Sequence, residues 1–122
     1  MIQILYIINL FNNDLVKCNK ALVWTDLTIE EVVGTTQIAL PTSWNELHIK
    51  ANINENNILV FINIIPADIT NINATYRAGY TQTSTSGGSA YFKIVNNKLY
   101  LDQAYLNTST VTNTTKWIAR YK

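Results

Sequence analysis

The chain has 122 residues, enough for one domain with a modest core and too few for two. Nine basic and eight acidic residues give a net charge of +1, which argues against a nucleic-acid partner. Charged residues make up 14% of the chain, against about 25% in an ordinary soluble domain, and Asn (16 residues) and Thr (15 residues) take their place. Such a polar but weakly ionic surface suits sugars or other protein surfaces better than acid–base chemistry.

Residues 1–22 differ from the rest and are expected to form an N-terminal docking or oligomerisation segment. Their apolar residues recur at alternating steps of three and four, the seam spacing of a coiled coil, and Ile in such a seam favours trimers or larger bundles. The candidate oligomerisation residues are Ile4, Ile8, Phe11, Leu15 and Leu22. Asn12-Asn13-Asp14 fits a turn equally well, so a β-hairpin or an extended arm added to a neighbour's sheet is the alternative.

The same segment gives two negative expectations. Its apolar run, Ile2 to Phe11, is too short to cross a bilayer and lacks the basic region and cleavage site of a signal peptide, so no membrane insertion is expected. Cys18 is the only cysteine, so an internal disulfide cannot form.

From residue 23 to 122 the chain consists of short alternating apolar runs separated by turns rich in Asn, Thr, Ser and Gly. This pattern predicts an all-β domain, an antiparallel, jelly-roll-like β-sandwich of seven or eight strands. The expected strands are Leu22–Leu27, Thr35–Leu40, Glu46–Ile53, Ile58–Ile65, Ala74–Thr83, Ala90–Val95, Lys98–Tyr105 and Thr115–Tyr121.

Four features refine this prediction. Glu46–Ile53 places Leu47, Ile49, Ala51 and Ile53 on one face and His48, Lys50 and Asn52 on the other. Ile58–Ile65 is apolar on both faces, which predicts a central strand. Ser84–Ser89 is expected to be a flexible hairpin loop, and Asn96-Asn97 a tight turn that uses left-handed backbone.

Groups that converge for catalysis are hard to find. His48, the only histidine, alternates with apolar neighbours and is expected to face solvent rather than serve as a catalytic base. The carboxylates that glycoside hydrolysis would need stand in no recognisable setting; they are Asp26, Glu30, Glu31, Glu46, Asp68 and Asp102. One Cys and one His argue against a zinc site. We therefore expect no enzyme, metal or cofactor.

Binding is the better supported class, because aromatic rings cover the C–H faces of sugars while amides, hydroxyls and guanidinium groups bind their hydroxyls. Residues of this character near strand ends and loops are Tyr76, Arg77, Tyr80, Gln82, Tyr105 and Asn107. The alternative for each tyrosine is packing in the core. Trp44 and Trp117 are expected to anchor the core.

Three segments resemble a known family. Gly34-Thr-Thr-Gln-Ile-Ala-Leu-Pro-Thr-Ser-Trp-Asn-Glu-Leu-His-Ile49 resembles the opening of a small β-sandwich domain found at the C-termini of bacteriophage tail, baseplate and fibre proteins. Tyr76-Arg-Ala-Gly-Tyr80 is similar to a central motif of that domain, and Tyr105 to Thr115 to its closing segment. The resemblance covers the chain from Trp24 to its end.

The resemblance implies a virion surface protein, made in the bacterial cytoplasm and extracellular in the mature particle. It implies a homotrimer that attaches to the host surface, and multivalent binding of host glycan would supply the affinity. The alternative is a head-fibre or capsid-decoration protein that binds only other virion proteins. A carbohydrate-binding module detached from its enzyme is a third possibility.

Overall fold

The computed structural model describes residues 23–55, 58–66, 75–82 and 86–122, and for residues 77–82 it describes the backbone alone. Residues 1–22, on which the predicted docking segment falls, lie outside the described residues. The described chain is all-β, as predicted. Its strands are β1 (Thr25–Asp26), β2 (Val32–Val33), β3 (Ile38–Ala39), β4 (Leu47–Ile53), β5 (Ile58–Ile64), β6 (Thr75–Gln82), β7 (Gly87–Val95), β8 (Lys98–Leu106), β9 (Ser109–Thr110) and β10 (Lys116–Tyr121). A 3-10 turn, η2 (Thr112–Thr114), precedes β10.

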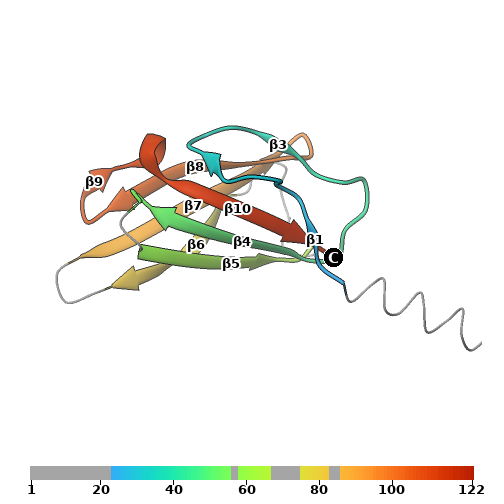
Figure 1. The fold of residues 1–122 in the computed structure, drawn as a ribbon, viewed down its shortest axis with the longest axis horizontal. Coiled ribbons are helices and arrows are strands. Elements are labelled where there is room, and N and C mark those ends of the chain that lie inside the picture. The colour runs from blue at the N-terminus through green and yellow to red at the C-terminus, as the bar shows by residue number, and fades with distance from the viewer. Residues whose placement is uncertain (1–22, 56–57, 67–74, 83–85) are drawn as a thin grey trace, which may run out of the picture.

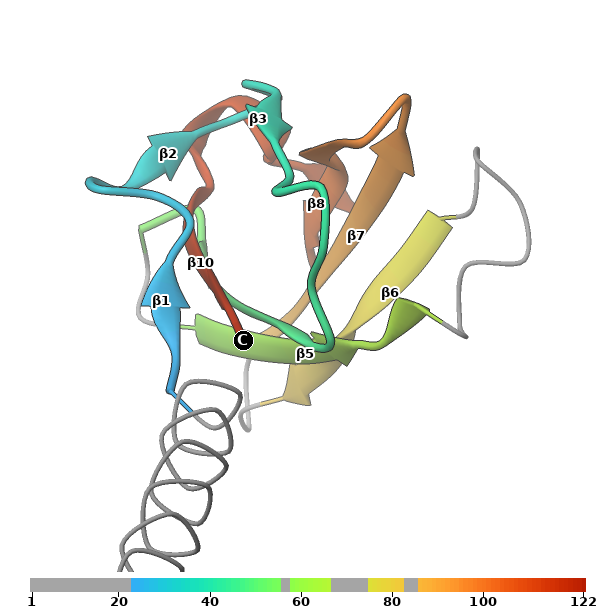
Figure 2. The same ribbon diagram turned by 90° about the vertical axis from the view of Figure 1, so that its right-hand side faces the viewer.

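Two antiparallel sheets pack against each other and form the predicted β-sandwich (Figure 1). The sheet that we call the front sheet has the order β1–β10–β4–β5, and β2 also pairs with β10. The back sheet has the order β3–β8–β7–β6, and β9 also pairs with β8. β5 and β6 lie side by side at one margin, where the two sheets approach each other (Figure 2).

The core lies between the sheets and is built by the expected alternation. In β4, Leu47, Ile49, Ala51 and Ile53 are buried, whereas the residues between them point to the outer face of the front sheet. Each inward residue is a hydrophobic side chain removed from water, which stabilises the fold by roughly 25 cal/mol per Å² of apolar surface. Trp117 is 1% exposed at the centre of this core.

The predicted Asn96-Asn97 turn is confirmed. β7 and β8 pair from Val95 and Lys98 outward, and the two turn residues have φ angles of 51° and 59°. Asparagine tolerates this left-handed backbone better than most residues, and two such residues in a row match the twist of the flanking strands. The two asparagines therefore fix the register of the longest hairpin of the back sheet.

The prediction that Ile58–Ile65 is a central strand is wrong. β5 pairs with β4 and stands at the end of the described strand order of the front sheet, where β10 and β4 are central. Phe61 points outward and is 52% exposed. An apolar side chain on the outer face produces the same unbroken apolar run as burial on both faces, so the run alone did not distinguish the two arrangements.

The prediction of a flexible loop over Ser84–Ser89 is also wrong for its second half. Gly87 to Ser89 belong to β7 and are buried. A Cβ atom on Gly88 would lie only 2.7 Å from Ile58 Cγ2 and 3.0 Å from Ile53 Cγ1. The glycine is therefore needed because the two sheets approach closely there, and not because the chain bends.

The first two expected strands form shorter ladders than predicted. Among the described residues of Leu22–Leu27 the paired strand is Thr25–Asp26, and within Thr35–Leu40 it is Ile38–Ala39. Both segments lie at sheet edges, where they cross only the end of a longer strand. Strand propensity alone does not predict how many residues of a segment pair with a neighbouring strand.

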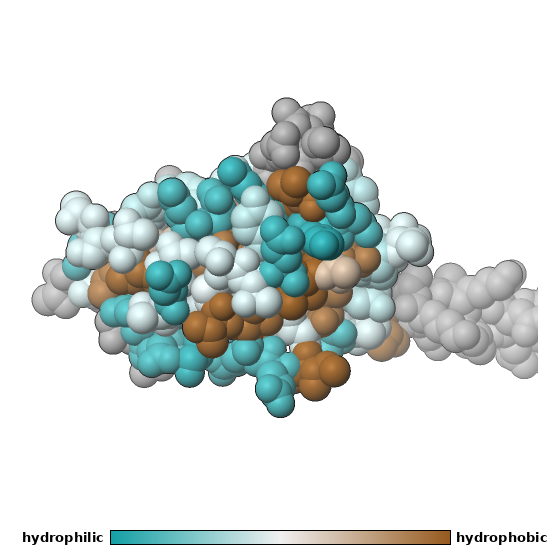
Figure 3. Space-filling model, turned by 90° about the horizontal axis from the view of Figure 1, so that it is seen from above, coloured by the Kyte–Doolittle hydropathy of each residue, from teal (hydrophilic) through white to brown (hydrophobic). Residues whose placement is uncertain are grey.

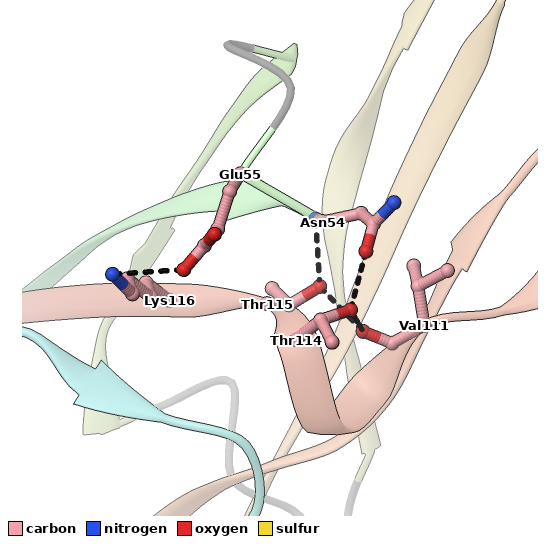
Figure 4. A network of polar contacts seen from close by, with 6 residues as sticks. All are labelled: Asn54, Glu55, Val111, Thr114, Thr115 and Lys116. Atoms are coloured by element: carbon pink, nitrogen blue, oxygen red, sulfur yellow. Dashed lines mark hydrogen bonds and ion pairs between the residues drawn. The ribbon is translucent and has the colours of Figure 1, made fainter.

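A polar network joins the β4–β5 turn to the turn before β10 (Figure 4). The buried hydroxyl of Thr115 accepts a hydrogen bond from the Asn54 N–H at 3.1 Å and donates one to the Val111 carbonyl at 2.9 Å. The Thr114 hydroxyl donates to Asn54 Oδ1 and to the Val111 carbonyl. Backbone groups in these turns have no ladder partner, so the threonines supply one.

Candidate functional site

The outer face of the front sheet presents three rows of side chains, because the strands of this sheet align residue by residue. The rows run across β10, β4 and β5 as Arg120–His48–Asn63, Ile118–Lys50–Phe61 and Lys116–Asn52–Leu59. The residues between them in each strand point into the core. Polar, charged and aromatic side chains from three separate segments therefore meet on one surface.

At one end of this face, rings and cations gather around Trp24, which directly precedes β1. The His48 ring lies 5.8 Å from the Trp24 ring and stacks on Phe61, with ring centroids 6.0 Å apart and 13° between the planes. Arg120 Cζ and Lys122 Nζ lie 4.6 Å and 4.8 Å from the centroid of the Trp24 ring. Such cation–π contacts contribute about 0.5–1 kcal/mol each at exposed sites. We call these five residues the aromatic cluster.

His48 is held neutral in this cluster. Arg120 Nε donates a hydrogen bond to His48 Nδ1 over 3.2 Å, so that nitrogen is an acceptor and the ring proton is on Nε2. Partial burial, followed by the charge of Arg120, lowers the pKa of His48 from its ordinary value of 6.5, and the nearby Glu46 carboxylate offsets part of this effect. At neutral pH the ring therefore offers an N–H donor.

A hollow of about 480 Å³ opens beside the cluster, and we call it the outer-sheet hollow. Strands β4 and β10 contribute His48, Lys50 and Arg120 to its lining, and the chain around β1 contributes Asp26, Glu30 and Glu31. In the described part of the chain the ion pairs involve Lys93, Lys116 and Lys122, so neither Lys50 nor Arg120 has a carboxylate partner. Cationic donors and anionic acceptors thus line the same open space.

The residues predicted to bind ligand lie on the back sheet. Tyr76 in β6 is half-buried and packs against the core. Tyr105 in β8 is half-buried, meets Tyr91 edge-on at 6.0 Å, and donates its hydroxyl proton to Gln103. For Arg77, Tyr80 and Gln82 only the backbone is described, and the pairing of β6 with β7 shifts by one residue between Arg77 and Tyr80. A ligand-binding role for this set stays a prediction.

Asn107, the sixth predicted binding residue, has a structural role in the back sheet. It adopts a left-handed φ of 55° where β8 ends. Its Oδ1 accepts a hydrogen bond from the Gly87 N–H at 2.9 Å, and its own N–H donates to the Gly87 carbonyl at 2.7 Å. These two bonds join the end of β8 to the start of β7.

Of the two predicted core anchors, Trp117 is the one at the centre. Its Nε1–H donates to the Gly34 carbonyl at 3.0 Å, and its ring meets Phe92 edge-on at 5.2 Å. Gly34 has a φ of +65°, a conformation that favours glycine. Trp44 is half-buried and packs at the margin of the core. The predicted oligomerisation residues lie outside the described residues; they are Ile4, Ile8, Phe11, Leu15 and Leu22.

Of the carboxylates considered for catalysis, Asp26, Glu30 and Glu31 line the outer-sheet hollow, and the other two described ones do not. Glu46 and Asp102 form ion pairs with Lys122 at 3.4 Å and Lys93 at 3.6 Å, and Asp68 lies outside the described residues. Within the described ranges no three His, Cys, Asp or Glu side chains gather in a way that would hold a metal ion. The same ranges contain no helix long and apolar enough to span a membrane.

Trp24, Lys50 and Arg120 were not predicted from the sequence to be members of one site. The available signal was alternation, which placed His48 and Lys50 on the polar side of one strand and Arg120 on the polar side of another. Alternation within a strand does not show which strands are neighbours or in which register they pair. The pairing of β10 with β4 supplies that information.

Comparison with protein-family models, curated proteins and solved structures found no significant match to this chain.

Proposed function

We propose that this protein is a bacteriophage virion surface protein that attaches the particle to polysaccharide on the host cell. The observation that carries this proposal is the outer-sheet hollow with the aromatic cluster beside it. The family resemblance of three sequence segments supports the assignment to a virion. The alternating sandwich supplies a rigid support for such a surface.

The chemistry of this surface suits a polymer rich in hydroxyl groups. The ammonium group of Lys50 and the guanidinium group of Arg120 donate hydrogen bonds, and the carboxylates of Asp26, Glu30 and Glu31 accept them. Sugar hydroxyls do both. The exposed part of the Phe61 ring offers an apolar surface for the C–H face of a sugar.

Open surfaces of this kind bind weakly one at a time, so multivalency is part of the proposal. A homotrimer held together through residues 1–22 would present three such surfaces, and linking sites raises the apparent affinity by about 10²–10⁴ without new contacts. Other virion proteins would hold the trimer on the particle.

Binding to immobilised capsular and cell-wall polysaccharides tests this proposal, with the full chain displayed in many copies on a bead. Lys50→Gln and Arg120→Gln should each weaken binding about tenfold, because each removes a charge-assisted hydrogen-bond donor. Lys98→Gln is the matched control, since Lys98 is an exposed cation at the start of β8 in the other sheet. Absence of binding to every polysaccharide, or equal binding by all three variants, would overturn the proposal.

A second candidate function is a structural virion protein that binds only other virion proteins. The observation that favours it is exposed apolar surface: Ile29 at the rim of the outer-sheet hollow is 99% exposed and Ile118 on the sheet is 37% exposed. Seen from above, hydrophobic residues interrupt the polar surface (Figure 3). Under this alternative, Ile29→Asp should abolish incorporation of the protein into particles, because the apolar contact is lost. Incorporation would not depend on polysaccharide binding.

A further inference from the structure

A second hollow, of about 420 Å³, lies at the end of the sandwich where the β7–β8 turn meets the chain that leads into β4. This is the end at which the C-terminus is marked in Figure 1. Leu40, Trp44, Pro66 and Ile94 supply its apolar lining, and Thr42, Ser43, Asn96 and Asn97 supply the polar groups. We call it the end hollow. It shares no lining residue with the outer-sheet hollow.

Hydrogen bonds hold two of the segments that line the end hollow. The Leu40 N–H donates to the Asn97 carbonyl at 2.9 Å, and Asn97 Nδ2 donates to the Leu40 carbonyl at 3.0 Å. On the other side of Trp44, the Asn45 N–H donates to the Lys122 carbonyl at 2.7 Å. A ligand entering the hollow would therefore not have to order these segments, which lowers the free-energy cost of binding.

The chemistry of the lining is uncharged. None of the lining residues carries an ionisable group near neutral pH, unlike the outer-sheet hollow. The hydroxyls of Thr42 and Ser43 and the side-chain amide of Asn96 are exposed and have no hydrogen-bond partner among the described residues. Beside them lies the half-buried indole of Trp44, over a floor of buried Leu40 and Ile94.

From this arrangement we infer that the end hollow is a binding subsite for a neutral sugar unit, a hexose or N-acetylhexosamine residue of a glycan chain. An aromatic ring beside hydroxyls and an amide matches the two sides of a pyranose, one apolar and one rich in hydroxyls. A charged sugar would lose hydration without gaining an ionic partner there. The volume falls within the range of about 300–1,000 Å³ that is typical of small-molecule sites.

The inference rests on the proposed function only for its ligand class, glycan, and uses a different part of the molecule. Binding of a neutral sugar here would add a second contact point per subunit, beside the charged outer-sheet hollow. Two surfaces of different chemistry would then bind a single polysaccharide chain that contains neutral and acidic units.

Titration of the full-length, ¹⁵N-labelled protein with neutral methyl glycosides tests the inference by nuclear magnetic resonance. The probes are the methyl glycosides of glucose, galactose, mannose and N-acetylglucosamine, each added to about 100 mM, well above a dissociation constant on the order of 1 mM. We expect at least one of them to shift the indole N–H signal of Trp44 in a saturable manner. The indole signal of the buried Trp117 should stay in place.

Three substitutions identify the site without removing core side chains. Thr42→Ala and Ser43→Ala each delete an exposed hydroxyl, and Asn96→Gly deletes the amide while keeping a residue that tolerates the positive φ of 51°. Each should weaken glycoside binding about threefold to tenfold, the effect of one lost hydrogen bond. Thr110→Ala is the matched control, because it deletes an exposed hydroxyl in β9, at the other end of β8, and it should leave the affinity for neutral glycosides unchanged.

Two results would overturn the inference. One is the absence of a saturable Trp44 shift with all four glycosides; the other is a shift that the three end-hollow variants leave unchanged. If neutral glycosides shift Trp24 instead, the end hollow is not the subsite, although polysaccharide attachment through the outer face still holds. If Trp44 responds but displayed protein binds no polysaccharide, the proposed attachment function fails and the sugar subsite stands.

Discussion

Threonine side chains complete backbone hydrogen bonds at three places where the ladders are interrupted. The buried hydroxyl of Thr28 accepts from the Ala119 N–H at 3.2 Å, that of Thr112 accepts from the Ala104 N–H at 3.0 Å, and that of Thr115 accepts from the Asn54 N–H at 3.1 Å. A buried N–H without a partner costs about 1–3 kcal/mol. Part of the threonine content of this chain therefore stabilises the fold and does not serve the surface.

His48 leads to a pH prediction. Because its pKa is lowered in the folded protein, the unfolded chain binds the proton more readily. Its contribution is therefore intact above the ordinary pKa of 6.5, and stability is lost as the pH falls below that value. Melting temperatures between about pH 7.5 and pH 5.5 should fall more steeply for the wild type than for His48→Gln, which does not titrate.

The comparison of the two slopes isolates this one group, because the two proteins differ only at residue 48. Glutamine also retains an oxygen that can accept the Arg120 hydrogen bond, so the cluster keeps its packing at neutral pH. If the melting temperatures of the two proteins fall equally with pH, folding does not lower the pKa of His48.

At the scale of the elements, close approach of the sheets decides the role of the short Gly-Gly-Ser stretch at the start of β7. Gly88 faces Ile53 and Ile58 across the core, with no room for a Cβ atom. In the sequence alone, Gly87-Gly88 indicates a turn, because glycine is also common in tight loops. Packing between sheets, which the sequence does not display, determines which of the two roles applies.

Gly88→Ala should destabilise the protein by about 1–3 kcal/mol, because the added methyl group overlaps the Ile58 side chain. Chemical denaturation measures the loss. Ile58→Leu removes the branch at Cβ, so the double variant should lose less stability than the sum of the two single variants. Additive losses would show that the Gly88–Ile58 contact is not the cause.

On the scale of the whole molecule, two hollows of unlike chemistry open on different parts of the surface. The outer-sheet hollow combines charges of both signs with the aromatic cluster, and the end hollow has hydroxyls, amides and one indole. Neither requires the other for its geometry. Their separation allows substitutions to test each binding proposal independently.

The oligomeric state is a prediction about residues 1–22 and the sandwich together. If the apolar seam trimerises the chain, Ile8→Asp places a charge in it and should lower the solution mass about threefold, from trimer to monomer. Light scattering measures the mass. Asn9→Asp is the matched control, because residue 9 lies outside the seam and the trimer should persist.

Two other outcomes of the light-scattering experiment would change the proposed function. A trimer that survives Ile8→Asp would place the assembly contacts in the sandwich. A wild-type monomer would contradict the trimeric fibre interpretation and leave a decoration protein or a detached carbohydrate-binding module.

Local rules predicted much of this fold, because they depend on neighbours in the sequence. The alternation in Glu46–Ile53 identified β4 and its buried face, that in Thr115–Tyr121 identified β10, and Asn96-Asn97 identified the β7–β8 turn. The fold class followed from the same period-two pattern. Prediction of the candidate site was less successful. The residues predicted to bind ligand lie on the back sheet, and the Asn107 side chain accepts a backbone hydrogen bond from Gly87.

The sequence by itself therefore determined the β-sandwich class, the inward and outward faces of β4, and the polar, weakly charged composition of the chain. Only the tertiary structure decided that β5 stands at the end of the described order of the front sheet, that Gly88 lies in the core, and that Trp24, His48 and Arg120 meet. The physical reason is that alternation is set within a strand, whereas strand order and register arise from the fit between segments far apart in the chain.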